Sequence, residues 1–307
     1  MNVTDAVQKT YRINLHMHTT DSDGKKTPEE AIETYKAAGY DAVAITDHWK
    51  FGAEREIGGM KVLSGCEYNF GGNEASSDDV YHILALLCES DPMVEKTDSP
   101  TVCVEKIHRA GGIAVLAHPA WSMDQPDRVE AIEKAAGFDA TEIFNTVSGE
   151  KHSNRPYSGG FVDQMANRGI FYPLFAADDV HYYEADGTSS AIIVSLPELT
   201  REALIDAIKR KDFYAVSGGK DAPTLEVTDL GNTIRIKCSP VSEINVFSSY
   251  AWAADRHVVG EGLTELEYRC VLPTRKKQDR WIRVEVTDAA GRTAYSNLIE
   301  KTEQIGE

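Results

Sequence analysis

The chain has 307 residues, of which 42% are hydrophobic and 26% charged, a composition typical of a soluble globular protein with room for one large and one small domain. Its formal net charge of -17 disfavours tight binding to duplex nucleic acid, because an acidic surface repels a polyanion, although bound cations can reverse the field locally. Five widely spaced cysteines without a CxxC pair argue against a disulfide framework, and the lack of a signal peptide or of ~20 consecutive apolar residues predicts a cytoplasmic protein with no membrane segment.

The first two thirds of the sequence alternates short apolar strands with capped helices. Tyr11 to His18 alternates apolar and polar residues and predicts a strand. Thr27 to Glu30 resembles a capping box with proline at the first helical position, so a helix is expected to run to Ala38. Further strands are expected at 42–46, 60–63, 81–87, 113–117, 140–144 and 170–176, and helices at 99–111, 126–137, 160–168 and 200–211. This alternation favours a parallel sheet, open or closed into a barrel.

The pattern changes after Gly219, where helical periodicity disappears. Strands are expected at 224–227, 233–238, 243–247, 264–272, 281–287 and 293–299, with a hairpin turn at 288–291. The sequence therefore predicts an α/β domain over residues 1–218 and a small all-β, sandwich-like domain over residues 219–307. The role of the second domain and the oligomeric state stay open at this point.

Six of the nine histidines fall at or near the C-terminal ends of predicted strands, where active sites of parallel α/β folds lie. These six are His16, His18, His48, His82, His118 and His181, and three acids accompany them: Asp23, Glu67 and Asp179. A single histidine is more often structural, but that interpretation does not account for six at strand ends. Mixed imidazole and carboxylate ligands suit Zn, Mn or Fe better than Ca or Mg. Such a cluster holds ions ~3.5–4 Å apart and lowers the pKa of a shared water toward ~7.

The motifs, taken together and in this order, resemble the PHP (polymerase and histidinol phosphatase) superfamily over roughly residues 11–218. They are His16-Met17-His18, Asp21-Ser22-Asp23-Gly24, Thr46-Asp47-His48, Glu67, His82, Ala117-His118-Pro119 and Asp178-Asp179-Val180-His181. The resemblance implies a distorted (β/α)7 barrel with a trinuclear metal centre. It places a first ion on His16, His18, Glu67 and Asp179, a second on Glu67, His82 and His118, and a third on Asp23, His48 and His181.

The resemblance leaves two assignments open: one of the metal ligands, and the residues that contact the substrate. Asp179 keeps the D-x-H spacing to His181, but Asp178 competes with it for the ligand position. Asn145 resembles a position near the pocket in relatives. Arg155 lies in the following loop, where it either clamps a phosphate group or stays on the surface.

The leading functional hypothesis is hydrolysis of a small phosphomonoester or phosphodiester, of the nucleotide or sugar phosphate class, by a hydroxide that bridges two or three divalent ions. Glu67, Asp179 and His181 are the candidate catalytic residues. One alternative is an amidohydrolase-like hydrolase of C–N or C–O bonds, although no lysine occupies the bridging position and Glu67 fills it. Another is a metal-binding module without catalytic activity.

Overall fold

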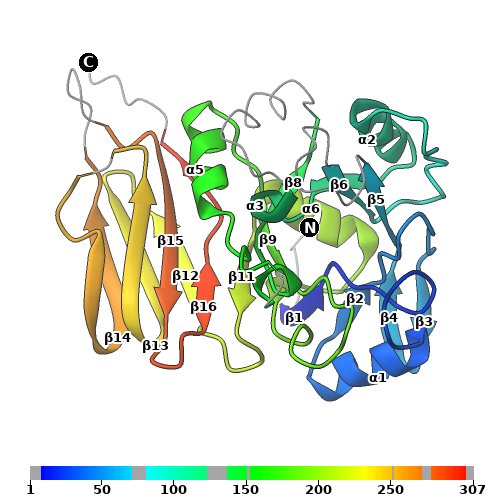
Figure 1. Cartoon of the computed structure of the whole chain (residues 1–307). Helices are drawn as coiled ribbons and strands as arrows, with labels where there is room; N and C mark the ends of the chain where they lie inside the picture. The colour runs from blue at the N-terminus through cyan, green and yellow to red at the C-terminus, as the bar shows by residue number, and fades with distance from the viewer. Residues whose placement is uncertain are drawn as a thin grey trace, which may run out of the picture.

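The computed structural model describes residues 8–70, 81–122, 137–150, 153–250, 252–271 and 278–301. They form a mixed α/β fold with two sheets (Figure 1). The helices are α1 (Pro28–Ala37), α2 (Pro100–Arg109), α3 (Pro119–Ser122), α5 (Gly159–Asn167) and α6 (Arg201–Arg210), with a 3-10 turn at Val147–Gly149. The helix expected at 126–137 lies, apart from its last residue, outside the described ranges.

The smaller sheet has five strands in the order β5-β6-β7-β8-β9. They are β5 (Gly65–Phe70), β6 (Tyr81–Leu86), β7 (Ile113–Leu116), β8 (Ala140–Asn145) and β9 (Leu174–Ala177). The strand pairs β7–β8 and β8–β9 are parallel, whereas β5–β6 and β6–β7 are antiparallel. The expectation of a parallel sheet is therefore correct for this part of the smaller sheet, and also for the strands at 9–14, 42–44 and 60–63 of the larger sheet, which pair parallel to one another.

The larger sheet runs in the order β12-β13-β15-β16-β11-β10-β1-β2-β4-β3, with β14 paired to β13 and β17 to β15. Its first seven strands in the chain are β1 (Lys9–Asn14), β2 (Ala42–Ala44), β3 (Arg55–Ile57), β4 (Met60–Leu63), β10 (Ala191–Leu196), β11 (Phe213–Ser217) and β12 (Leu225–Asp229). The last five are β13 (Thr233–Ser248), β14 (His257–Arg269), β15 (Trp281–Thr287), β16 (Thr293–Tyr295) and β17 (Ile299–Glu300). Strands β10 and β11, which the sequence pattern did not predict, pair antiparallel beside β1.

A closed barrel, the expected architecture, is not seen. Among the described residues, main-chain pairing between the two sheets is limited to isolated bridges, which pair Met17 with Val180, His48 with Glu67, and Gly52 with Gly65. Each bridge lies at a strand or beyond the end of one, where the chain turns into the loops around the histidines.

The strands that follow residue 219 continue the larger sheet instead of forming a sheet of their own. Strand β16 pairs with β11, with Tyr295 opposite Ala215, and so joins the two predicted parts by main-chain hydrogen bonds. Apolar side chains seal the same junction, because Trp281 and Tyr295 pack in one cluster with Ile143 and Val162. In Figure 1 these strands stand beside α5, at the left of the molecule. No helix in the described part of the chain is long and apolar enough to span a membrane.

Local signals in the sequence position the elements nearest the site. The capping box at α1 is confirmed, because Thr27 Oγ1 accepts from the Glu30 amide at 3.3 Å and Glu30 Oε2 accepts from the Thr27 amide at 3.0 Å. The first strand ends at Asn14, earlier than expected, so both His16 and His18 follow it. Because the strand ends before them, the two histidines are not part of its pairing, and their side chains turn toward the smaller sheet.

Candidate metal centre

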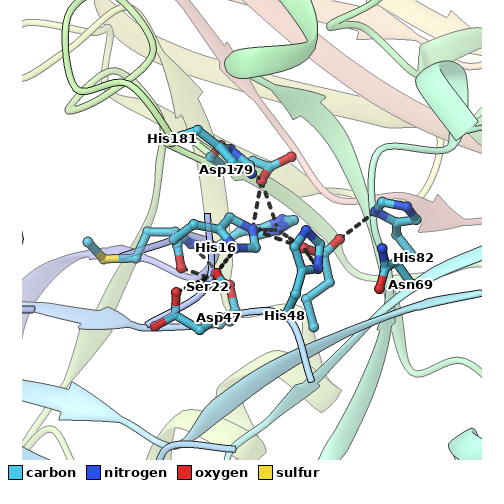
Figure 2. A network of polar contacts seen from close by, with 12 residues as sticks. His16, Ser22, Asp47, His48, Asn69, His82, Asp179 and His181 are labelled. Carbon is cyan, nitrogen blue, oxygen red and sulfur yellow. Dashed lines mark hydrogen bonds and ion pairs between the residues drawn. The ribbon is translucent and has the colours of Figure 1, made fainter. Parts of the chain in front are cut away.

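The nine residues predicted as ligands come together between the ends of the two sheets. His16, His18 and Asp23 follow β1, His48 follows β2, and the remaining five lie on or after strands β5, β6, β7 and β9. Figure 2 shows His16, His48, His82, Asp179 and His181 around one space. Their nitrogen and oxygen atoms form three overlapping groups, and the atoms within each group lie within 4.8 Å of one another. The groups are His16-His18-Glu67-Asp179, Glu67-His82-His118, and His18-Asp23-His48-His181.

Glu67 lies between two of these groups because its two oxygens face different histidines. Oε2 is 3.1 Å from His16 Nε2 and 2.9 Å from His18 Nε2. Oε1 is 2.8 Å from His82 Nδ1 and 3.4 Å from His118 Nε2. Asp179 closes the first group, with Oδ1 at 3.1 Å from the Nε2 atoms of both His16 and His18. A carboxylate whose two oxygens face different groups in this way would be able to bridge two metal ions.

The third group is more open to solvent. Asp23, whose side chain is 56% exposed, has its carboxylate oxygens 3.5 Å from His181 Nε2 and 3.8 Å from His48 Nε2. His18 faces this group with its other nitrogen, because Nδ1 is 3.6 Å from Asp23 Oδ1. The structure thus adds His18 to a set that the sequence analysis limited to Asp23, His48 and His181.

The donor set fits divalent transition metals. Three buried polar atoms in the cluster, His48 Nδ1, His82 Nε2 and Asp179 Oδ1, make no hydrogen bond among the described residues, although Asp179 Oδ1 and His48 Nδ1 face oppositely charged groups at 3.1 and 3.4 Å. Burying an unpaired polar atom costs on the order of 1–3 kcal/mol, so His82 Nε2 in particular is unfavourable unless a cation takes its lone pair. Imidazole nitrogens mixed with carboxylate oxygens are ligands that Zn, Mn and Fe accept.

The electrostatics of the cluster also favour bound positive charge. Burial alone would lower the pKa of His18, but the carboxylates of Asp179 and Glu67 outweigh it and raise that pKa to about 9. Burial opposes ionisation of Glu67 as well, yet the imidazoles of His16 and His82 hold its pKa well below the usual range. Without metal, protons on the histidines therefore balance the two carboxylates, and metal binding has to displace them.

Two ligand candidates have backbone angles that residues other than glycine seldom adopt. His118 has φ of 27° and Asp179 has φ of 53°. Conformations of this kind cost on the order of 1–3 kcal/mol each and persist where surrounding contacts fix them. The Asp179 amide donates to the His16 carbonyl at 2.9 Å, and the His118 amide donates to Glu142 Oε2 at 2.8 Å.

The structure resolves the choice between the two adjacent aspartates in geometric terms. Asp178 is buried and turns away from the cluster, accepting hydrogen bonds from Tyr35 at 2.7 Å, Thr146 at 2.9 Å and the Ser190 amide at 2.7 Å. Asp179 faces the histidines. The side chain of Asp178 therefore secures the end of β9, and Asp179 is the one placed to coordinate.

Sequence reasoning missed Glu142, a fully buried acid on β8. Its Oε1 lies 2.8 Å from His16 Nδ1, and its Oε2 accepts from the amide of His118 and from Asn145 Nδ2, both at 2.8 Å. With the Nδ1 proton directed at Glu142, the Nε2 atom of His16 is free to bind metal. A lone carboxylate inside the apolar run 140–144 was the signal available in the sequence.

The two predicted substrate contacts do not face the cavity beside the cluster. Asn145 is fully buried, donates to Glu142 and to Asp179 Oδ2 at 3.2 Å, and accepts from the Ser148 hydroxyl at 2.8 Å. Arg155 is exposed and is not among the lining residues. The structure therefore gives Asn145 a supporting position and places Arg155 on the surface.

The cavity itself has a volume of about 420 Å³ and opens over the three groups. Besides ligand candidates, its described lining includes Trp121, Ser148, Glu150, Ser153 and Tyr182. The Trp121 ring contacts His82 and His118 edge-on, with ring centroids 5.3 and 5.1 Å away. A small ester bound here would lie between the cluster and an aromatic wall.

Comparisons with known proteins agree with the motifs. Residues 14–99 match the family model described as PHP domain. An uncharacterized protein of Methanocaldococcus jannaschii is 26% identical over 147 residues, which are 44% of this chain and 81% of that protein. The resemblance to the PHP superfamily predicted from the motifs is thus confirmed.

One solved structure extends the similarity in fold beyond that segment. A two-domain Bacteroides vulgatus protein, described as containing a predicted PHP-like metal-dependent phosphoesterase, aligns with a TM-score of 0.52 and 14% identity over 95% of this chain and 96% of its own. A lesion-specific endonuclease of Pyrococcus furiosus aligns with a TM-score of 0.47 and 15% identity over 66% of this chain and 56% of its own. The first of these likenesses shows that the two-part fold occurs as a unit elsewhere.

Proposed function

We propose that this protein hydrolyses small phosphate esters, of the nucleotide or sugar phosphate class, with two or three divalent transition-metal ions of Zn, Mn or Fe. The observation that carries the proposal is the set of three overlapping ligand groups, which share Glu67 and His18 and border one cavity. When bound, such ions supply an activated water and shield the charge on the phosphoryl oxygens. The ligands proposed are His16, His18, Asp23, His48, Glu67, His82, His118, Asp179 and His181.

The residues proposed as catalytic hold the reacting groups in place. Glu67 fixes the distance between two of the ligand groups because its two oxygens face different histidines, and Asp179 faces the histidines of the first group. His181 directs Nδ1 to the Asp179 carbonyl at 2.7 Å, so its Nε2 is left facing Asp23 and the cavity. These side chains would hold the ions and orient a bound ester beside them. We assign the hydrolase to residues 1–218 and an accessory all-β role to residues 219–307.

The test compares cleavage of a nitrophenyl phosphate monoester and of the bis-nitrophenyl diester, with Mn²⁺ added and with a chelator. Faster monoester cleavage identifies a phosphatase. Faster diester cleavage identifies a phosphodiesterase, and short oligonucleotides and cyclic nucleotides are then the substrates to test next. His16→Ala and His118→Ala are expected to abolish turnover and lower metal content. His257→Ala is the matched control, because His257 is exposed and pairs with Glu243 outside the cluster. Absence of any chelator-sensitive cleavage would refute the proposal.

A further inference from the structure

One wall of the cavity is a loop between β8 and α5 whose two limbs are hydrogen-bonded to each other. It contributes Val147, Ser148, Glu150 and Ser153 to the lining. The Arg155 amide donates to the Ser148 carbonyl at 2.7 Å, and the Asn145 amide donates to the Pro156 carbonyl at 2.9 Å. The wall is therefore held in two places: at its first limb, where the Thr146 and Val147 amides donate to the Ala177 and Asp178 carbonyls at 2.9 and 3.0 Å, and at its returning limb, which ends at residue 157.

That limb is held by the C-terminal strands through Tyr157. Its hydroxyl donates to Glu285 Oε1 at 2.6 Å and accepts from Arg283 Nη2 at 3.1 Å, and both partners lie on β15. The Tyr157 ring stacks with that of Tyr295 on β16, at 6.4 Å between centroids.

The partners of Tyr157 are themselves fixed. Arg283 is 1% exposed, forms a bidentate pair with Asp163 of α5 at 2.7 and 3.1 Å, and lies 3.8 Å over the ring of Phe247. It also pairs with Glu285. A buried bidentate arginine holds its neighbours in a defined geometry, because losing one partner leaves a buried charge unpaired. The C-terminal strands are therefore a rigid support at this point.

The neighbours of Tyr157 extend this support to the opposite side of the cavity. Ser158 Oγ accepts from the Ala120 amide of α3 at 3.2 Å, and Trp121 follows directly in that helix. The Ser158 amide donates to the Ile143 carbonyl of β8 at 2.8 Å. Displacing Tyr157 would thus shift both the loop wall and the segment that carries Trp121.

We propose that strands β13, β15 and β16 set the shape of the substrate cavity, and that Tyr157 is the positioning residue through which they do so. The inference rests on the proposed function for its catalytic consequence only. It gives the C-terminal strands a role in substrate binding while the ligand groups stay independent of them. Removing the Tyr157 hydroxyl is then expected to weaken substrate binding and leave metal binding intact.

The test variant is Tyr157→Phe, which keeps the ring packing, and the matched control is Tyr268→Phe. Tyr268 is buried on β14, among the C-terminal strands, and its hydroxyl has the same kind of partners: it donates to Asp279 at 2.8 Å and accepts from Arg256 at 3.2 Å. Neither partner belongs to the loop between β8 and α5. Tyr157→Phe is expected to raise KM for the better nitrophenyl ester about 10-fold, with little change in kcat and unchanged metal content, because the half-buried hydroxyl that binds Glu285 and Arg283 is lost. Tyr268→Phe is expected to leave KM as in the wild type.

Hydrogen exchange of the Arg155 amide supplies a readout that needs no turnover. It is expected to be faster in Tyr157→Phe and unchanged in Tyr268→Phe. An unchanged KM, or an exchange rate unchanged in Tyr157→Phe or raised equally in both variants, would overturn the inference. If the wild-type protein cleaves no ester, the proposed function fails by itself, and the exchange rates alone decide whether Tyr157 holds the loop.

Discussion

Replacement of Glu142 by glutamine is expected to weaken metal binding by one to two orders of magnitude. Glu142 uses both oxygens, one facing His16 Nδ1 and the other accepting from the His118 amide and Asn145 Nδ2, each at 2.8 Å. An amide has a single acceptor oxygen, so one of these two sides must face the glutamine NH2. A buried donor left unpaired costs about 1–3 kcal/mol, which corresponds to roughly 5- to 150-fold in an equilibrium constant.

Loss of a group that orients a metal-bound histidine typically costs about 10–100-fold, in agreement with that range. The assay is a competition titration of Mn²⁺ or Zn²⁺ against a chelating dye, with metal content after desalting as a second measure. Glu285→Gln is the matched control, because Glu285 is also a buried glutamate but contacts Tyr157 and Arg283 instead of the cluster. Wild-type affinity in Glu142→Gln would refute the idea that Glu142 orients His16.

Three further results are expected. The pKa of His18 in the metal-free fold is raised to about 9, so the stability that protonated His18 contributes is complete below pH ~6.5 and is lost as the pH rises toward 9. The Tm of the chelated protein should therefore fall between pH ~6.5 and 9, and an equally steep fall in a chelated His18→Gln variant would contradict this. Trp281→Ala should lower the free energy of unfolding by about 3–5 kcal/mol in denaturant titrations, since its side chain is 1% exposed, and a loss below 1 kcal/mol would count against a shared core. Trp121→Leu should raise KM several-fold for a nitrophenyl ester but not for glycerol phosphate, because stacking of the nitrophenyl ring on the Trp121 ring contributes about 0.5–1.5 kcal/mol. An equal rise of KM for both esters would exclude stacking.

The residues of the candidate site were largely predictable because their signal is local. Histidines at strand ends and the D-x-H spacing of Asp179 and His181 can be read along the chain without knowing which strands pair. The capping box at Thr27 is equally local. Glu142 was not predictable as a site residue, because its importance arises from contacts with His16 and His118, which lie 126 and 24 residues away in the sequence.

The missed parts of the fold depend on pairing between distant segments. Strand β5 carries Glu67, but all its residues except Asn69 are buried, so it lacks the alternation that marks a strand with one exposed face. The antiparallel strands β10 and β11 break the βα alternation that suggested a parallel sheet. Nothing in the local sequence of β16 shows that its partner is β11, 76 to 80 residues earlier, since strand partners are chosen by long-range burial.

The pairing of β16 with β11 bears on how such a protein can be shortened or recombined. A fragment that stopped near residue 218 would present β11 as a bare sheet edge and would uncover the apolar side chains that pack against Trp281 and Tyr295. Unpaired edges next to exposed apolar surface favour aggregation. A form of this protein without the C-terminal strands would therefore need a replacement for that edge, in the form of charged side chains, a covering helix or a second subunit.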